Sequence, residues 1–253
     1  MRNLWTRRIV GATAVVSLAA WSLSAKEVNP LPEGSSVAVG AADIAFLQKG
    51  LSKEPQKREV PTLKAVAMLV ALNAQHQTDG KDGAKMAGLR DAALGVAAAV
   101  AKKDFAAAKT AAAGLADAKP AAAAKPVKIE ELITAHKFEL EELMSTFRKG
   151  TVGGLNLEAD VKAQSKAVTD PKVAAVIAGR IALIGEYTLL LPPEGTDATK
   201  KKQWDDWSKE MTDLAVKIST ESAKGATADK VKMAKGFRDL DANCNACHTV
   251  FRN

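Results

Sequence analysis

The two cysteines of the chain lie close together near its end, in the sequence Cys244-Asn245-Ala246-Cys247-His248. Cys-x-x-Cys-His is the attachment sequence of a c-type haem. In such a site both thiols add to vinyl groups of the porphyrin, and the adjacent imidazole reaches the iron. We therefore expect one covalent haem c on Cys244 and Cys247, with His248 as the proximal iron ligand.

Two other chemistries use a Cys-x-x-Cys pair. A dithiol redox pair normally lies where a strand opens a helix, and a structural zinc site takes about four ligands. His76 and His136 are distant in sequence and bring no partner pair. Haem is the favoured interpretation, with a disulfide or a zinc site as the alternatives. Apolar and motif residues here recur at the spacing of one helix face: Met233, Phe237, Leu240, Cys244, Cys247 and Phe251.

The first residues resemble an export signal. Arg2, Arg7 and Arg8 precede an apolar run over 9–20, and small residues follow it, which predicts a signal peptide at 1–25. An uncleaved anchor is the alternative, but the run is shorter than the ~20 residues that span a bilayer. We expect an exported, periplasmic protein with no stable membrane insertion after cleavage. This agrees with the motif, because haem c is attached on the exported side of the membrane.

The charge pattern limits the partners. The formal net charge is +7, and three arginines belong to the predicted signal. Charges of both signs alternate along the rest of the chain, which indicates a solvated surface and no nucleic-acid interface. The sequence is compatible with an acidic redox partner, of unknown identity, and with a homodimer. No paired acids, activated nucleophile or nucleotide loop is present, so we expect no enzyme.

A proline-flanked alanine stretch at 119–127 predicts a linker between two helical regions, 36–118 and 128–253. The alanine-rich composition and the periodicity predict four helices in each region, with an irregular stretch after Gly150. The expected fold is all-α: two tandem antiparallel four-helix bundles. The helices are expected near 40–50, 60–77, 84–102, 104–118, 128–149, 171–191, 201–220 and 226–251.

The two halves also look like copies of one unit. Lys102–Asp117 aligns with Lys224–Asp239, and continuing this alignment places linker residues opposite the haem motif. The first bundle is therefore interpreted as a haem-less copy. Its core of small residues buries little area per helix, so it should be the less stable half unless it docks on the second.

The expected helix over 128–149 supplies the other side of the haem pocket. Met144 is predicted as the sixth iron ligand, with a gap-filling role in the core as the alternative. His136 is a less favoured competitor, and its alternative is a partly exposed position at the edge of the stripe. Tyr187 either reaches a haem propionate or packs in the core, and His76 is expected to be a polar loop residue. The apolar stripe of this helix contains Ile129, Leu132, Ile133, His136, Leu140, Leu143, Met144 and Phe147.

The second half resembles the class II cytochromes c, the cytochrome c′ and cytochrome c-556 family. The resemblance rests on the C-terminal motif followed by Phe251 and Arg252, and on Leu143-Met144 in the opening helix. It implies a left-handed four-helix bundle with one haem, bound proximally by the motif histidine, and Arg252 as a basic residue near the haem edge, beside Phe251. Met144 is similar to the sixth ligand of the low-spin members, whereas high-spin members leave the iron five-coordinate. The long first half departs from the single-domain family pattern.

Three functions are compatible with these residues. The first is an electron carrier whose iron is bound by His248 and Met144. The second is a five-coordinate protein that binds diatomic gases such as NO or CO, with a distal face crowded by Leu140, Leu143 and Phe147. The third is an interaction protein whose first half docks a redox partner.

Overall fold

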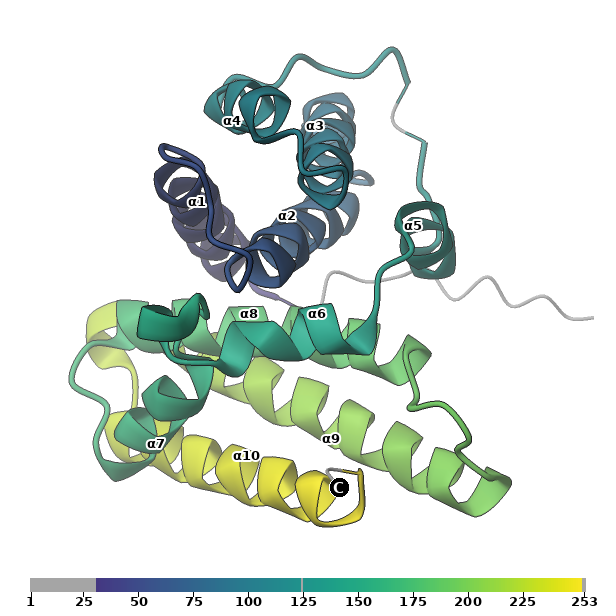
Figure 1. Cartoon of the computed structure of the whole chain (residues 1–253). Coiled ribbons are helices and arrows are strands. Elements are labelled where there is room, and N and C mark those ends of the chain that lie inside the picture. The colour runs from purple at the N-terminus through teal and green to yellow at the C-terminus, as the bar shows by residue number, and fades with distance from the viewer. Residues whose placement is uncertain (1–30, 124, 252–253) are drawn as a thin grey trace, which may run out of the picture.

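The computed structural model describes residues 31–123 and 125–251. Within these residues the chain forms ten α-helices and no strand, which confirms the all-α prediction. The predicted signal peptide and Arg252 lie outside the described residues. The helices before the linker are α1 (Glu33–Gly50), α2 (Val60–Gln75), α3 (Gly83–Ala101) and α4 (Phe105–Ala113) (Figure 1). Those after it are α5 (Ile129–His136), α6 (Leu140–Met144), α7 (Leu157–Lys166), α8 (Pro171–Leu190), α9 (Ala198–Ser222) and α10 (Lys230–Phe251).

Local capping explains where several helices begin. The Asp170 carboxylate accepts a hydrogen bond from the backbone N–H of Lys172, and Pro171 occupies the first turn of α8, where its missing N–H costs nothing. Asp197 caps α9 and Asp104 caps α4 in the same way. These caps satisfy backbone N–H groups that the helices themselves leave without a partner.

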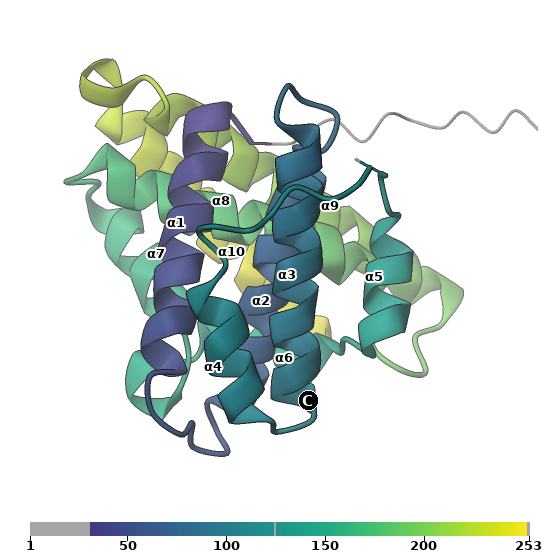
Figure 2. The ribbon, with the colours of Figure 1, turned by 90° about the horizontal axis from the view of Figure 1, so that it is seen from above.

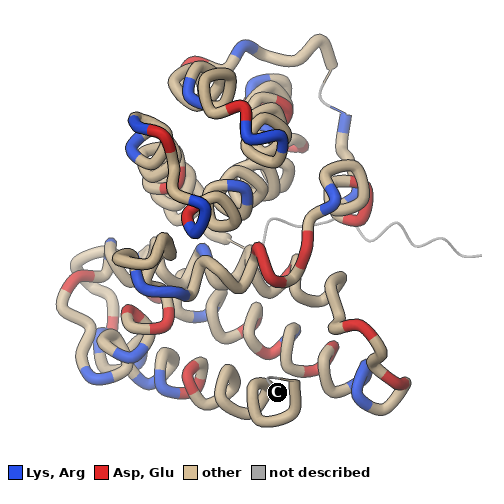
Figure 3. The backbone as a smooth tube through the Cα atoms, in the orientation of Figure 1, with Lys and Arg blue, Asp and Glu red and all other residues tan. Residues whose placement is uncertain are grey.

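In the first half α2 packs against α1 and α3, and α4 packs against α3. In the second half α8, α9 and α10 pack side by side, each antiparallel to the one before it, and α7 lies against α10 (Figure 1). The halves are docked, because α1 crosses α8 and α2 contacts both α6 and α8 (Figure 2). One hydrophobic core continues through both halves. Lys, Arg, Asp and Glu are mixed over the two halves (Figure 3).

Helix α8 is the one described helix that is long and apolar enough to cross a membrane. Two thirds (67%) of its apolar stretch is buried, as in the core helix of a globular protein. Its neighbours α1 and α9 cover this apolar surface.

Polar contacts also join the two halves. The Tyr187 hydroxyl donates to the Met68 carbonyl oxygen at 3.0 Å, and the side chain is fully buried, so of its two predicted roles the structure shows packing in the core. The sequence predicts His76 as a polar loop residue, but it is buried at the end of α2, with Nε2 2.7 Å from a carboxylate oxygen of Glu186 on α8.

The predicted helix over 128–149 is wrong, because the chain breaks after α5. Lys137 adopts a left-handed conformation with φ of 44°, and the N–H of Phe138 closes the helix end on the Ile133 carbonyl oxygen at 3.0 Å. Phe138 turns into the core, edge-on to the ring of Tyr187 with centroids 5.1 Å apart. Glu139 and Glu142 then form a capping box that starts α6. A short 3₁₀ turn, η1 (Ser145–Phe147), continues α6.

Two further differences concern the connections. The stretch after Gly150, expected to be irregular, contains helix α7. The linker region is non-helical where described, and it is held against α3: the N–H of Ala121 donates to the Ala84 carbonyl oxygen at 2.8 Å. A Cβ atom added at Gly88 would collide with the carbonyl oxygen of Lys119. The linker therefore lies along the first half.

The buried ion pair between the halves gives a first prediction. Arg180 Nε lies 2.6 Å from Asp43 Oδ1, and the Asp43 side chain is fully buried. Arg180→Met leaves this carboxylate without its partner, so we expect the free energy of unfolding to fall by about 3 kcal/mol or more at neutral pH. Burial raises the pKa of Asp43, so the native state gains stability relative to the unfolded chain as the carboxylate is protonated at lower pH. The loss should shrink toward pH ~4, near the ordinary pKa of an aspartate.

Urea unfolding at several pH values measures this effect. Lys235→Met is the matched control, since it breaks the exposed pair with Asp239 and should change stability little. A loss in Arg180→Met that is the same at acid and neutral pH would contradict the buried-charge explanation.

Candidate cofactor pocket

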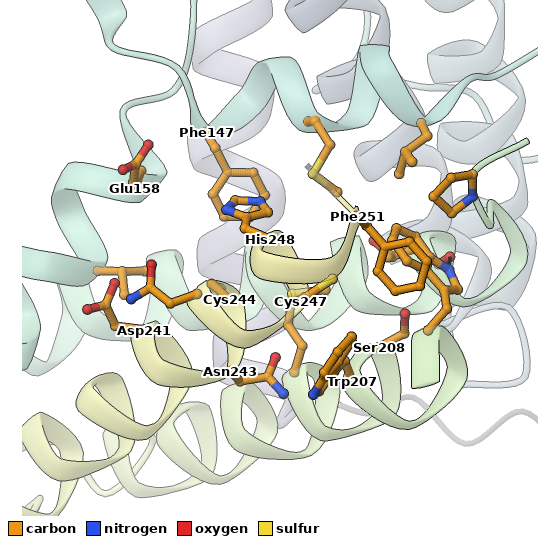
Figure 4. A pocket seen from close by; sticks show the side chains of 18 of the residues that line it. Phe147, Glu158, Trp207, Ser208, Asp241, Asn243, Cys244, Cys247, His248 and Phe251 are labelled. Atoms are coloured by element: carbon orange, nitrogen blue, oxygen red, sulfur yellow. Dashed lines mark hydrogen bonds between the residues drawn. The ribbon is translucent and has the colours of Figure 1, made fainter. Parts of the chain in front are cut away.

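A cavity of about 420 Å³ lies between α6 and η1 on one side and the last turns of α10 on the other, with α7 and α9 closing it (Figure 4). This volume is in the range of small-molecule and cofactor sites. Its walls are mainly apolar and aromatic, with charged side chains on α7, after η1 and, as Asp241, on α10. The apolar members are Leu140, Met144, Phe147, Val161, Pro193, Trp204, Trp207, Met211 and Phe251.

Helix α10 brings the motif to this cavity. Its earlier apolar positions, Phe237 and Leu240, are fully buried in the core. The same face continues along the helix to Cys244, Cys247 and Phe251, all of which line the cavity. The side-chain amide of Asn243 donates to a Glu210 carboxylate oxygen on α9 at 2.9 Å, which fixes the rotation of this last part of α10.

His248 lies next to the second thiol and also lines the cavity. Figure 4 shows His248 rising from α10 while Phe147 descends from the facing wall. Both thiols and the imidazole are therefore presented to one apolar space.

The two thiols can be examined for the dithiol redox chemistry that is one alternative to haem attachment. Cys244 and Cys247 are not bonded to each other. Burial, helped by Asp241, raises the pKa of Cys244 to about 12, and burial raises that of Cys247 to about 11. Redox dithiols need a thiolate and are found at helix N-termini, where the helix dipole lowers the thiol pKa. These two thiols lie in the last turns of α10, so the geometry does not favour dithiol redox chemistry.

A site formed by protein ligands alone is not favoured either. Among residues 31–123 and 125–251, no three His, Cys, Asp or Glu side chains gather closely enough to hold a metal ion. A haem places fewer demands on the protein, because the porphyrin supplies the equatorial nitrogens.

The facing wall comes from α6 and η1. Leu140, Met144 and Phe147 are spaced so that they share one face, and all three line the cavity. Leu143 points the other way and is fully buried in the core. The expectation that Leu143 crowds this face is therefore wrong, whereas Met144 lies opposite the motif in the same cavity.

The structure does not bring His136 to the cavity. It lies at the end of α5, beyond the break at Lys137, and is not among the lining residues. Burial, together with the nearby positive charge of Lys64, lowers its pKa. Arg252, the other predicted cofactor contact, lies outside the described residues.

Several lining residues were not predicted as site residues. Trp204 and Trp207 of α9 hold Phe251 edge-on, with ring centroids 5.0 and 6.0 Å apart. Their spacing with Met211 on α9 marks one helix face, which is a signal that sequence could have provided. On α7, Glu158 and Lys162 form an ion pair of 2.6 Å at the cavity, and Arg148 adds a second cation.

Comparisons of the chain with models of protein families, with curated proteins and with solved structures found no match.

The indole of Trp204 gives the prediction for this site. Its Nε1–H donates to the Thr188 carbonyl oxygen at 2.7 Å, and the ring is buried. Trp204→Phe keeps an aromatic ring against Phe251 but removes this hydrogen bond. The Thr188 carbonyl oxygen still accepts from the backbone N–H of Leu191 at 3.0 Å, so we expect a loss of about 1 kcal/mol in unfolding free energy. Trp207→Phe is the matched control, because that ring is partly exposed. Chemical unfolding compares the two, and equal losses would contradict the role of the buried hydrogen bond.

Proposed function

We propose that the chain is an exported monohaem c-type cytochrome that carries single electrons. Cys244 and Cys247 would hold the haem by thioether bonds, and His248 and Met144 would bind the iron. The observation that carries this proposal is the shared cavity. The complete attachment motif and a methionine from a separate helix line opposite sides of one mainly apolar space.

The cavity fits a haem in its chemistry. Two thiols one helical turn apart match a group that is attached to the protein through two of its carbon atoms, and the adjacent His248 can supply a nitrogen ligand. The apolar and aromatic walls suit the porphyrin faces. When bound, the haem supplies an iron that changes between two oxidation states.

The chain's own residues would set the properties of that iron. A thioether opposite a histidine favours the reduced state and raises the reduction potential. The aromatic side chains of α9 and α10 exclude water from one end of the cavity, which lowers the local dielectric. Arg148 and Lys162, which pair with Glu141 and Glu158 in this structure, line the cavity and would be the cations that offset the haem carboxylates, and Arg252 stays a predicted contact at the haem edge.

The proposed architecture is a class II cytochrome c bundle at 128–253, preceded by the linker at 119–127 and a haem-less copy at 36–118. Among the described residues four helices, α1 to α4, precede the linker, as the copy requires, whereas six shorter and longer helices, α5 to α10, follow it in place of the four expected. Helix α1 begins before that boundary, at Glu33. The signal peptide at 1–25 and a periplasmic location complete the proposal, with a redox protein as the partner.

A five-coordinate protein that binds NO or CO is the second candidate. The observation that favours it is the apolar pair Leu140 and Phe147 on either side of Met144, since an apolar distal face admits a small diatomic and disfavours water. Docking of a partner by the first half has less support, because α1 and α2 already contact the second half.

The attachment of haem is tested by producing the chain with its signal in a periplasm that carries out haem c maturation. We expect a coloured protein whose mass increases by one haem and whose haem stays bound after denaturation. The double variant Cys244→Ala, Cys247→Ala should lose the covalent haem, because both thioether bonds are gone. Asn245→Ala, within the same motif, is the control and should keep it. A colourless wild-type protein would refute the proposal.

The sixth ligand is tested on the oxidised haem protein. We expect a low-spin spectrum with a methionine-to-iron charge-transfer band in the far red. Met144→Ala should abolish this band, raise the high-spin fraction and lower the reduction potential. Met211→Leu is the matched control, since Met211 lines the same cavity from α9, and it should keep the charge-transfer band. A high-spin wild-type spectrum that Met144→Ala does not change would favour the gas-binding candidate.

A further inference from the structure

The wall that carries Met144 is attached to the first half of the chain. Behind it, helix α2 contacts α6 and η1. The Thr62 hydroxyl of α2 lies 2.9 Å from the Ser145 hydroxyl, and both residues are fully buried. Ser145 directly follows Met144, so this contact holds the end of α6.

Lys64 of α2 holds the beginning of the same wall. Its ammonium group donates to the Lys137 carbonyl oxygen at 2.9 Å and to the Glu142 carboxylate at 2.8 Å. Glu142 also accepts from the backbone N–H of Glu139, which closes the capping box of α6. One buried ammonium thus joins the left-handed turn after α5 to the first turn of α6.

The lysine is unusual for its place. It is 6% exposed, within a run of α2 in which every residue from Thr62 to Gln75 is buried. Burying an ammonium group is costly unless it is paired, and an apolar side chain of similar volume is often at least as stable. The stability of the core therefore does not explain why a lysine occurs here. A role in holding α6 in one defined place does explain it.

The wall needs such anchors because it is short. Helix α6 has five residues, and helices of this length are not stable on their own in water. The direction of its side chains is therefore set by tertiary contacts. Leu143 contributes by packing into the core on the face opposite the cavity.

We propose that Lys64 and Thr62 are positioning residues for Met144, so that the first half of the chain completes the haem site. This inference rests on the proposed function. The two side chains act from behind the wall: Lys64 orients the first turn of α6 through Glu142, and Thr62 orients its end through Ser145. Loss of either would let Met144 move relative to His248, and a haem iron held by these two side chains would then be bound less tightly by the thioether.

The test uses the full-length haem protein with Lys64→Met and Thr62→Val. We expect a weaker far-red charge-transfer band, a larger high-spin fraction and a lower reduction potential in both. Amides of residues 140–147 should exchange hydrogen about tenfold faster or more, because the local opening of an unanchored short helix costs less. Thr62→Ser keeps the hydroxyl and should restore the wild-type spectrum. If Lys64→Met does not fold, the Thr62 pair carries the test.

Glu186→Gln is the matched control. It weakens another buried contact between the two halves, the one between Glu186 and His76, and Glu186 does not line the cavity. It should leave the charge-transfer band unchanged. The inference would be overturned if Lys64→Met and Thr62→Val left both the charge-transfer band and the hydrogen exchange of 140–147 unchanged. It would also be overturned if Glu186→Gln changed them equally, or if the wild-type haem protein were high-spin. A wild-type chain without covalent haem would instead refute the proposed function, and hydrogen exchange of 140–147 in that chain would still decide whether Lys64 and Thr62 anchor the wall.

Discussion

The burial of α2 is the constraint on which the rest of the structure depends. Every residue of this helix from Thr62 to Gln75 is buried, with α1 and α3 on one side and α6 and α8 on the other. A helix without a solvent face has to be enclosed by its neighbours, and its polar side chains have to find partners there. Lys64 and Thr62 find them on the α6 wall, and His76 finds its partner on α8. Neither half can bury α2 alone, so the two regions that the sequence separates at a linker share one core.

This shared core determines how the cavity is built. One wall, α10 with the two thiols and His248, is packed by its own apolar face against α9 and α7. The other wall, α6 and η1, depends on α2. The cavity thus lies between an element held within the second half and an element held by the first. An alanine-rich first half with few large side chains can still serve this purpose, since close helix approach and a few buried polar contacts fix position well without much buried area.

The sequence predicted the parts of the fold whose periodicity is unbroken. The expected helices near 60–77, 84–102 and 171–191 correspond to α2, α3 and α8, and the helical face from Met233 to Phe251 leads the thiols into the cavity as expected. The break at Lys137 could not be predicted, because a left-handed lysine has no propensity signal and the apolar stripe continues across it. It arises from tertiary contacts, namely Phe138 on Tyr187 and the Lys64 ammonium on the Lys137 carbonyl. The same break removes His136 from the site. Helix α7 was missed because only Leu157 and Val161 mark its buried face.

The coupling between the halves works in both directions. If the first half sets the position of Met144, then thermodynamic linkage requires that a ligand bond at Met144 stabilises the contacts of Lys64 and Thr62 to the same degree. A group bound to the native state alone also shifts the whole unfolding equilibrium, and α2 extends that effect to α1 and α3 through the core they share. A first half that only covered an apolar face would need none of these buried polar contacts, because apolar side chains would cover that face with less desolvation. We therefore interpret the paired ammonium of Lys64 as the group that fixes where α6, the wall of the cavity, lies along α2.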